Sequence, residues 1–299
     1  MKIYYNDHVQ VPLPPGHRFP MAKYGMLHRA LLEEGVASPG QLHPSPALEP
    51  AQLIAAHDPA YVEAFLAGTL ERSAIRRIGL PWSEAFVERV RTSMGGTLLA
   101  TLHALESGIS GNLAGGTHHA HRDQGGGFCV FNDLAIAALS LIASGDVRRV
   151  AIVDLDVHQG DGSATILKDT PDVFTLSVHC EKNYPFHKPA SDLDVALPDS
   201  CDDATYLGAL EQALESVWRH RPELIIYQAG VDPLAEDSLG RMNLTLRGLA
   251  ERDRMVLSQA YHRNVPVALT LGGGYARPIE PTVEAYLQTY RIARSIFGG

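Results

Sequence analysis

From residue 132 onward, short apolar runs rich in β-branched residues alternate with segments of helical periodicity. The apolar runs lie at 150–155, 173–178, 224–229 and 266–271, and the helical segments at 132–144, 163–169, 203–220, 245–262 and 279–296. Continuous apolar strands separated by helices are typical of a parallel sheet whose two faces are both covered. The pattern predicts an α/β fold with a mostly parallel central sheet.

The first part of the chain is less regular. Residues 1–50 are rich in Pro and His and predict loops around one helix at 24–34, and 83–107 has helical periodicity that ends at Gly108. No linker rich in Pro, Gly or Ser divides the chain. We therefore expect residues 1–299 to form a single domain.

Composition narrows the class of protein. The 299 residues are 45% hydrophobic, which is enough to bury a large core, and the net charge is −9. An acidic chain disfavours duplex nucleic acid as a partner, because the phosphate backbone requires a basic face, although a local basic patch remains possible. Cys129, Cys180 and Cys201 lie far apart, without metal-binding spacing, which fits a reducing cytoplasm. We expect no signal peptide and no membrane span, since no apolar stretch approaches about 18 residues.

Polar and ionisable residues follow nearly every predicted strand. The segments that follow are DLDVHQGDG at 154–162, SVH at 177–179, GVD at 230–232 and GGGY at 272–275, and a further turn reads GGTHHA at 115–120. In open parallel sheets, ligands bind beyond the carboxyl ends of the strands. We therefore expect the functional site at this edge of the sheet.

Asp156, His158 and Asp232 form a candidate metal site. Two residues apart in an extended segment, Asp156 and His158 can point to the same side, and Asp232 stands at the end of another strand. One imidazole and two carboxylates, with positions open for water and substrate, are typical of a catalytic divalent-metal site. The alternative interpretation is a capping aspartate beside a structural histidine.

His118 and His119 are candidates for acid–base catalysis, because the pKa of an imidazole suits neutral pH. Such histidines need carboxylate partners, and Asp154 and Asp161 flank the metal motif. Alternatively the two histidines are solvated surface residues and Asp161 caps a helix at 162–167. Tyr275 follows three glycines that allow close approach to a ligand, or is a packed residue at a strand exit.

The segments GGTHHA, GGGFCVFND, DLDVHQGDG, QAGVD and LGGGY occur in this order between residues 115 and 275. Together they resemble the histone deacetylase superfamily of zinc amidohydrolases. Gln159 and the segment HRFPMAKY are similar to its bacterial, class IV-related branch. The resemblance implies the arginase/deacetylase fold and a zinc-dependent deacylase that hydrolyses acetyl-lysine or a related N-acyl amine with metal-activated water.

The resemblance also implies roles for individual residues. The ligands of one Zn²⁺ per chain would be Asp156, His158 and Asp232. The residues of the reaction would be His118, His119, Asp154, Asp161 and Tyr275. The walls of the substrate tunnel would be Gly127, Phe128, Phe186 and Leu239. A structural K⁺ would be held by Asp154, Asp156, His158, Ser177 and Val178, and a second K⁺ would lie near Leu167, Thr170 and Val173.

Other functions on this fold stay open. The substrate could be an acyl-lysine protein or peptide, an acetylpolyamine or another small amide. A binuclear manganese ureohydrolase needs a D-x-H-x-D run that this chain lacks, and an inactive acyl-lysine binder would have lost part of the residue set. In class I members a carboxylate grips the substrate backbone at the tunnel rim. The corresponding residues here are Gly79, Leu80 and Pro81, so the resemblance implies no such grip.

Overall fold

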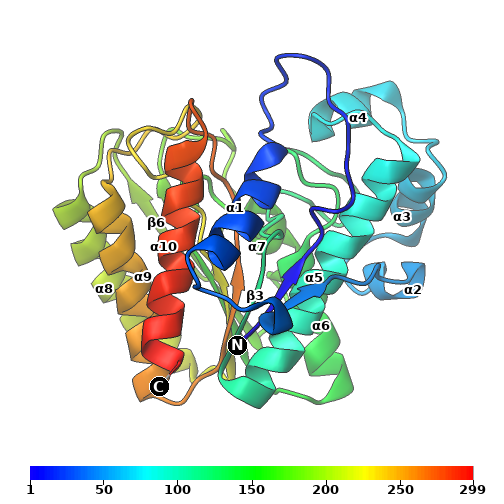
Figure 1. Ribbon diagram of the computed structural model, residues 1–299. Helices are drawn as coiled ribbons and strands as arrows, with labels where there is room; N and C mark the ends of the chain where they lie inside the picture. The colour runs from blue at the N-terminus through cyan, green and yellow to red at the C-terminus, as the bar shows by residue number, and fades with distance from the viewer. Residues whose placement is uncertain (299) are drawn as a thin grey trace.

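The computed structural model describes residues 1–298, which fold around one eight-stranded sheet (Figure 1). Every pair of neighbouring strands is parallel, in the order β2-β1-β3-β8-β7-β4-β5-β6. The strands are β1 (Lys2–Tyr5), β2 (Leu42–Pro44), β3 (Ile109–Asn112), β4 (Val150–Asp154), β5 (Val173–Cys180), β6 (Leu193–Leu197), β7 (Leu224–Gln228) and β8 (Val267–Thr270). The prediction of a parallel α/β sheet is confirmed.

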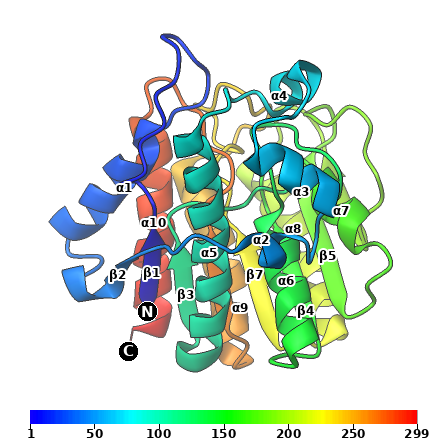
Figure 2. The same cartoon turned by 90° about the vertical axis from the view of Figure 1, so that its right-hand side faces the viewer.

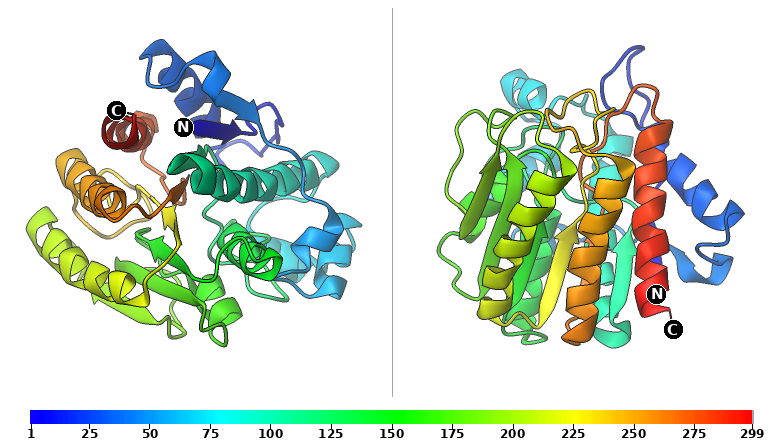
Figure 3. Two further views of the ribbon diagram at one scale, coloured as in Figure 1. Left: turned by 90° about the horizontal axis from the view of Figure 1, so that it is seen from below. Right: turned by 90° about the vertical axis from the view of Figure 1, so that its left-hand side faces the viewer.

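Helices cover both faces of this sheet. They are α1 (Ala22–Glu33), the 3₁₀ turn η1 (Pro39–Gln41), α2 (Pro50–Leu53), α3 (Pro59–Leu66), α4 (Arg72–Ile78), α5 (Glu84–Ser107), α6 (Asp133–Ser144), α7 (Asp161–Leu167), α8 (Asp203–His220), α9 (Leu246–His262) and α10 (Glu280–Phe297). Seen from below in Figure 3, α8, α9 and α10 lie on one side of the sheet and α5 and α6 on the other. Figure 2 shows α5 running across the front of the second face.

Each face of the sheet has its own apolar core. Along β4, Ala151 and Val153 pack into the core under α8, α9 and α10, whereas Val150 and Ile152 pack into the core under α5 and α6. This alternation follows from the two-residue period of a strand. Because both faces are buried, the strand is a continuous apolar run, which is why it was recognisable in the sequence.

Local signals set the helix ends. Ser83 accepts a hydrogen bond from the amide of Phe86 and so caps α5, and Asn132 caps α6 in the same way through Ala135. Gly145 ends α6 in the left-handed conformation, at φ 79°. The predicted helices therefore agree with the observed ones to within one or two residues, including 203–220 for α8.

The sequence patterns did not predict β1, β2, β3 or β6, nor the short helices α2, α3 and α4. Strand β2 has three residues, and β3 reads ISGN, with neither β-branched enrichment nor a continuous apolar run. Such segments become strands because the fold places them beside a neighbouring strand. The β-propensity of their own residues does not predict this.

The topology creates a crevice between β4 and β7, which are neighbours in the sheet. The chain leaves β4 toward β5 and β6 on one side, and returns through β7 to β8 on the other. Loops after β4 and β7 therefore diverge at the carboxyl edge, which is the arrangement that opens a binding site in parallel sheets. In residues 1–298, no helix is both long and apolar enough to cross a membrane.

Candidate active site

Asp156 and His158 follow β4, and Asp232 follows β7, so the crevice brings the three side chains together. All three are buried, and one ligand atom from each lies within 4.8 Å of the others. Nδ1 of His158 lies 2.9 Å from Oδ1 of Asp156 and 3.1 Å from Oδ2 of Asp232. The structure thus places a possible metal-binding group where the sequence predicts one.

The backbone holds the two carboxylates in place. The amide of Val157 donates to Oδ1 of Asp232 at 2.8 Å, and the amide of Gly273 donates to Oδ2 of Asp156 at 2.6 Å. A Cβ on Gly273 would lie 1.9 Å from Oδ2 of Asp232, so only glycine allows this approach.

The electrostatics of the group fit a divalent cation. Burial raises the pKa of Asp232, and the negative charge of Asp156 raises it further. Two buried carboxylates at this spacing repel each other unless a positive charge lies between them. A divalent cation removes that penalty, and the oxygen and nitrogen donors match the ligands that Zn²⁺ takes.

Two histidine–aspartate pairs lie beside this group. Nδ1–H of His118 donates to Asp154 at 2.7 Å, and Nδ1–H of His119 donates to Asp161 at 2.6 Å. The two imidazole rings are 4.1 Å apart between centroids, and all four residues are buried. Each carboxylate orients its imidazole and leaves Nε2 available for proton transfer.

The surroundings of the two histidines differ. Burial lowers the pKa of His118, but the charges of Asp154 and Asp156 outweigh burial and raise the pKa to about 9. Burial and the neighbouring charge of His118 lower the pKa of His119 to about 4. The interpretation of the pair as solvated surface residues is wrong, since they are 2% and 5% exposed.

Asp161 does not cap α7. The helix begins at Asp161 itself, and its N-cap residue is Gly160 without a side-chain cap. The Asp161 carboxylate instead accepts from His119 and, at 3.1 Å, from Nε2–H of His121. The capping interpretation fails because the side chain turns toward the two histidines.

Tyr275 is half-buried, and desolvation of the phenol holds its pKa well above the ordinary value, so the phenol keeps the proton that it would donate. Two residues that the sequence patterns did not single out hold its turn. The ammonium of Lys23, almost completely buried, donates to the carbonyl of Gly274 at 3.2 Å and lies 5.0 Å from the centre of the Tyr275 ring. Asp237 accepts from the amides of Tyr275, Leu239 and Gly240.

A cavity of about 580 Å³ joins these groups to the surface. The predicted wall residues Gly127, Phe128, Phe186 and Leu239 all line it. Phe128 packs 5.9 Å from the ring of Tyr275, but Phe186 is 87% exposed and lies at the outer end. Tyr184, which the sequence did not single out, is the aromatic residue next to the histidines, with its ring 4.8 Å from that of His119.

Two of the residues expected to hold K⁺ lie opposite each other on neighbouring strands. Asp154 pairs with Ser177 in the register of β4 and β5, and Val178 follows. Oδ1 of Asp154 accepts from the amide of Asp156 at 3.2 Å, while Oγ of Ser177 lies 3.0 Å from Nδ1 of His179. The K⁺ site stays a prediction, as does the second one near Leu167, Thr170 and Val173.

With this geometry established, comparison with known proteins places the chain in a family. The profile of the histone deacetylase domain matches residues 17–289. The chain belongs to the histone deacetylase family. It is 47% identical over 296 residues to an uncharacterized protein of Picosynechococcus, covering 99% of this chain and 98% of that protein.

Matches to histone deacetylases described by name cover less of their length. The chain is 37% identical to Arabidopsis thaliana histone deacetylase 2 over 202 residues, which is 65% of this chain and 52% of that protein. The chain therefore spans about half of that deacetylase.

Solved structures share the fold. A histone deacetylase homologue complexed with SAHA and one from Aquifex aeolicus each give a TM-score of 0.83 at 24% identity. The first match covers 99% of this chain and 84% of the other, and the second covers 98% and 83%. The fold is therefore that of the histone deacetylase homologues.

Proposed function

We propose that this member of the histone deacetylase family is a zinc-dependent deacylase that hydrolyses the amide of acetyl-lysine or a related N-acyl amine. One observation carries the proposal. A single cavity is lined by Asp156, His158, His118, His119 and Tyr275. The carboxylates of Asp232, Asp154 and Asp161 contact these histidines from behind. Each is a group that amide hydrolysis requires.

Asp156, His158 and Asp232 would hold the zinc ion. A bound Zn²⁺ would supply polarisation of the substrate carbonyl and a lowered pKa for water. The protein would hold these ligands rigid through the amides of Val157 and Gly273.

The two histidines would divide the proton transfers. His119, held by Asp161 through Nδ1–H, would accept the proton of the attacking water at Nε2. His118 lies against Asp154 at 2.7 Å and has Nε2 3.9 Å from Asp156, so two carboxylates favour its protonated form. His118 would therefore be the protonated imidazole that donates a proton to the leaving amine.

Tyr275 would donate a hydrogen bond to the carbonyl oxygen as negative charge develops on it. Such a donor contributes most when it is oriented before the reaction and water is excluded. Asp237 and Lys23 would supply that orientation by binding the N–H and the carbonyl of the peptide bond between Gly274 and Tyr275.

The test is hydrolysis of a fluorogenic acetyl-lysine amide by the purified, zinc-loaded protein, with metal content measured on the same sample. We expect turnover that a chelator abolishes and Zn²⁺ restores. The His119→Ala variant should keep its zinc but lose about 10²- to 10⁴-fold in rate, the range for a general base. A screen of other acyl groups, acetylpolyamines and small amides then identifies the amine carrier. Absence of turnover across the whole screen, with zinc bound, would contradict the proposal.

A further inference from the structure

The mouth of the cavity is lined by positively charged side chains from four separate segments. They come from the loop before α1, from α4, from the loop after β5 and from the loop after β7, and are Arg18, Arg77, Lys182 and Arg241. Figure 1 shows the loop before α1 and helix α4 rising together at the upper end of the molecule. All four side chains are exposed. Among the described residues 1–298, Asp156 at the metal group is the only carboxylate that lines the cavity.

Little in the structure neutralises these charges. Nε–H of Arg77 donates to the carbonyl of Gly125, which carries no net charge. Arg241 has an exposed partner, Asp199, at 3.6 Å, and such pairs are weak. Within residues 1–298, Arg18, Arg77 and Lys182 form no ion pair.

The four segments together also carry a net positive charge in the sequence. Residues 17–19, 72–79, 181–188 and 236–241 contain seven Arg and Lys against three carboxylates. One of the three, Asp237, is turned inward and accepts backbone hydrogen bonds. The mouth is therefore a positive region on a chain whose net charge is −9.

Local charge decides what approaches this opening. At physiological ionic strength exposed charges are screened beyond about 8 Å, so the remaining negative charge of the chain contributes little at the mouth. Cationic groups around an opening attract an anionic partner and disfavour a cationic one. The residues beside the opening at Gly79, Leu80 and Pro81 offer no carboxylate to a basic peptide.

From this arrangement we propose that the preferred substrate is an acyl-lysine flanked by acidic residues in a peptide or protein. The inference rests on the proposed deacylase function and names its substrate class. The acyl-lysine side chain enters the cavity beside Phe128, while carboxylates of the flanking residues meet Arg18, Arg77, Lys182 and Arg241. Tyr184 and the exposed ring of Phe186 provide apolar contact between these charges.

The test compares three peptides of one length, each with a central acetyl-lysine and flanks of Asp and Glu, of Lys and Arg, or of Ser and Ala. At low salt we expect kcat/KM to be at least about 10-fold higher for the acidic peptide than for the basic one, chiefly through KM. The ratio should shrink as NaCl is raised, because screening weakens exposed charges.

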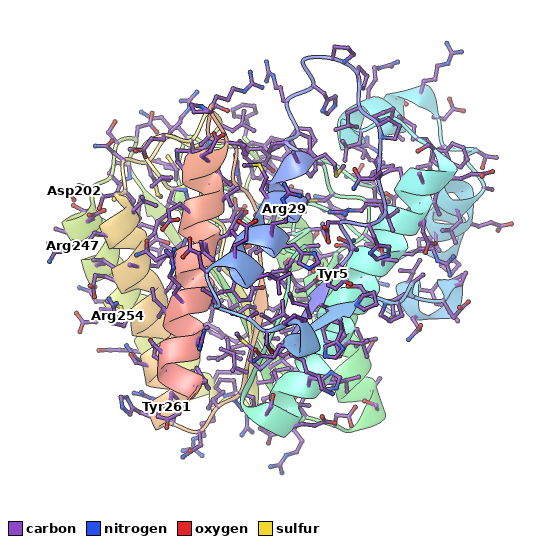
Figure 4. The ribbon with its side chains drawn as sticks, in the orientation of Figure 1. Tyr5, Arg29, Asp202, Arg247, Arg254 and Tyr261 are labelled. Atoms are coloured by element: carbon purple, nitrogen blue, oxygen red, sulfur yellow. The ribbon has the colours of Figure 1, made fainter. Side chains whose placement is uncertain are left out.

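Charge reversal at the mouth sharpens the test. The double variant Lys182→Glu, Arg241→Glu should reverse the order of the acidic and basic peptides, with each kcat/KM expressed relative to the same variant's kcat/KM on an uncharged fluorogenic acetyl-lysine amide. The matched control is Arg247→Glu, an exposed arginine on α9 at the side of the molecule (Figure 4). It changes the net charge in the same sense and should preserve the order.

The outcomes separate the two proposals. Turnover of none of the peptides or the uncharged amide would contradict the deacylase function itself. Equal turnover of the three peptides, or preference for the basic one, would overturn the acidic-substrate inference alone. Free Nε-acetyl-lysine completes the set of substrates, and turnover confined to it would also overturn the inference, by showing a small-molecule substrate in place of a peptide.

Discussion

The floor of the cavity, with the metal group beneath it, is buried and consists of histidines and aspartates, whereas the mouth is exposed and carries arginine and lysine. The floor consists of Asp156, His158, Asp232, His118 and His119, and the mouth of Arg18, Arg77, Lys182, Arg241 and Phe186. Every floor residue is at most 9% exposed and hydrogen bonded, while Phe186 at the mouth is 87% exposed. The loops that follow β3, β4 and β7 at the carboxyl edge of the sheet carry the floor, and more exposed loops and the short helix α4 carry the mouth.

This difference shows that the floor of the cavity serves catalysis and the mouth serves substrate recognition. A buried, hydrogen-bonded group keeps the geometry that a reaction needs. Exposed charges at the ends of flexible side chains each contribute little binding energy, and they can adapt to different partners. Changes in the floor should therefore alter kcat by orders of magnitude, and changes in the mouth should alter KM by small factors.

The largest effect is expected for Asp232→Asn. A neutral amide replaces an anionic ligand, so the metal group loses half of its carboxylate charge. We expect most of the bound zinc to be lost and turnover to fall to background. Metal analysis and a rate measurement on the same sample check this. A variant with full zinc occupancy and full activity would remove Asp232 from the floor.

Tyr275→Phe keeps the ring and its packing against Phe128 but removes the donor. We expect kcat to fall about 10²- to 10³-fold, the scale for one oxyanion donor, with little change in KM. Zinc content and Tm should stay close to the parent. Steady-state kinetics decide the matter, and an unchanged kcat would make Tyr275 a packing residue only.

Behind the floor, His57 supports the loop that carries the histidine pair. Its Nδ1–H donates to the carbonyl of His121, and its Nε2 accepts from the amide of Asn132. Asn132 in turn donates to the carbonyl of His118 at 3.4 Å. This arrangement requires a neutral imidazole, and burial lowers the pKa of His57 from 6.5 to about 4.

The sign of the resulting pH dependence follows from the two pKa values. In the unfolded chain His57 is protonated below about pH 6.5, whereas in the folded protein it is protonated only below about pH 4. The stability associated with neutral His57 is therefore complete above pH 6.5 and is lost as the pH falls toward 4. Between pH 7 and pH 5, we expect the free energy of unfolding to fall by about 2 kcal/mol more in the parent than in His57→Gln. Denaturant unfolding at both pH values measures it, and equal losses would refute the proposed role of the neutral imidazole.

The smallest effect is expected for Phe186→Ala at the mouth. The ring is already mostly exposed, so little buried area is lost when it is removed. We expect KM for a peptide to rise roughly threefold, about 0.6 kcal/mol, with kcat unchanged. Peptide kinetics test this, and a large fall in kcat would erase the distinction between mouth and floor.

Much of the floor could be anticipated from the chain. Asp156, His158 and Asp232 follow apolar runs that are recognisable as buried parallel strands, and such strands end at one edge. The structure brings the metal group together as the strand pattern implied. The roles of these residues in catalysis stay predictions.

The sequence by itself determined that four segments, β4, β5, β7 and β8, are buried parallel strands, because their continuous apolar runs and lengths are local properties. It also carried the family motifs, since they are short and ordered. Only the tertiary structure decided that β3 is a strand, that Tyr184 lies against His119 in place of Phe186, and that Lys23 and Asp237 hold the turn of Tyr275. Lys23 and Gly274 are separated by 251 residues, and no local pattern encodes such a contact. Contacts between distant segments depend on how layers pack, so they emerge only when the whole chain has folded.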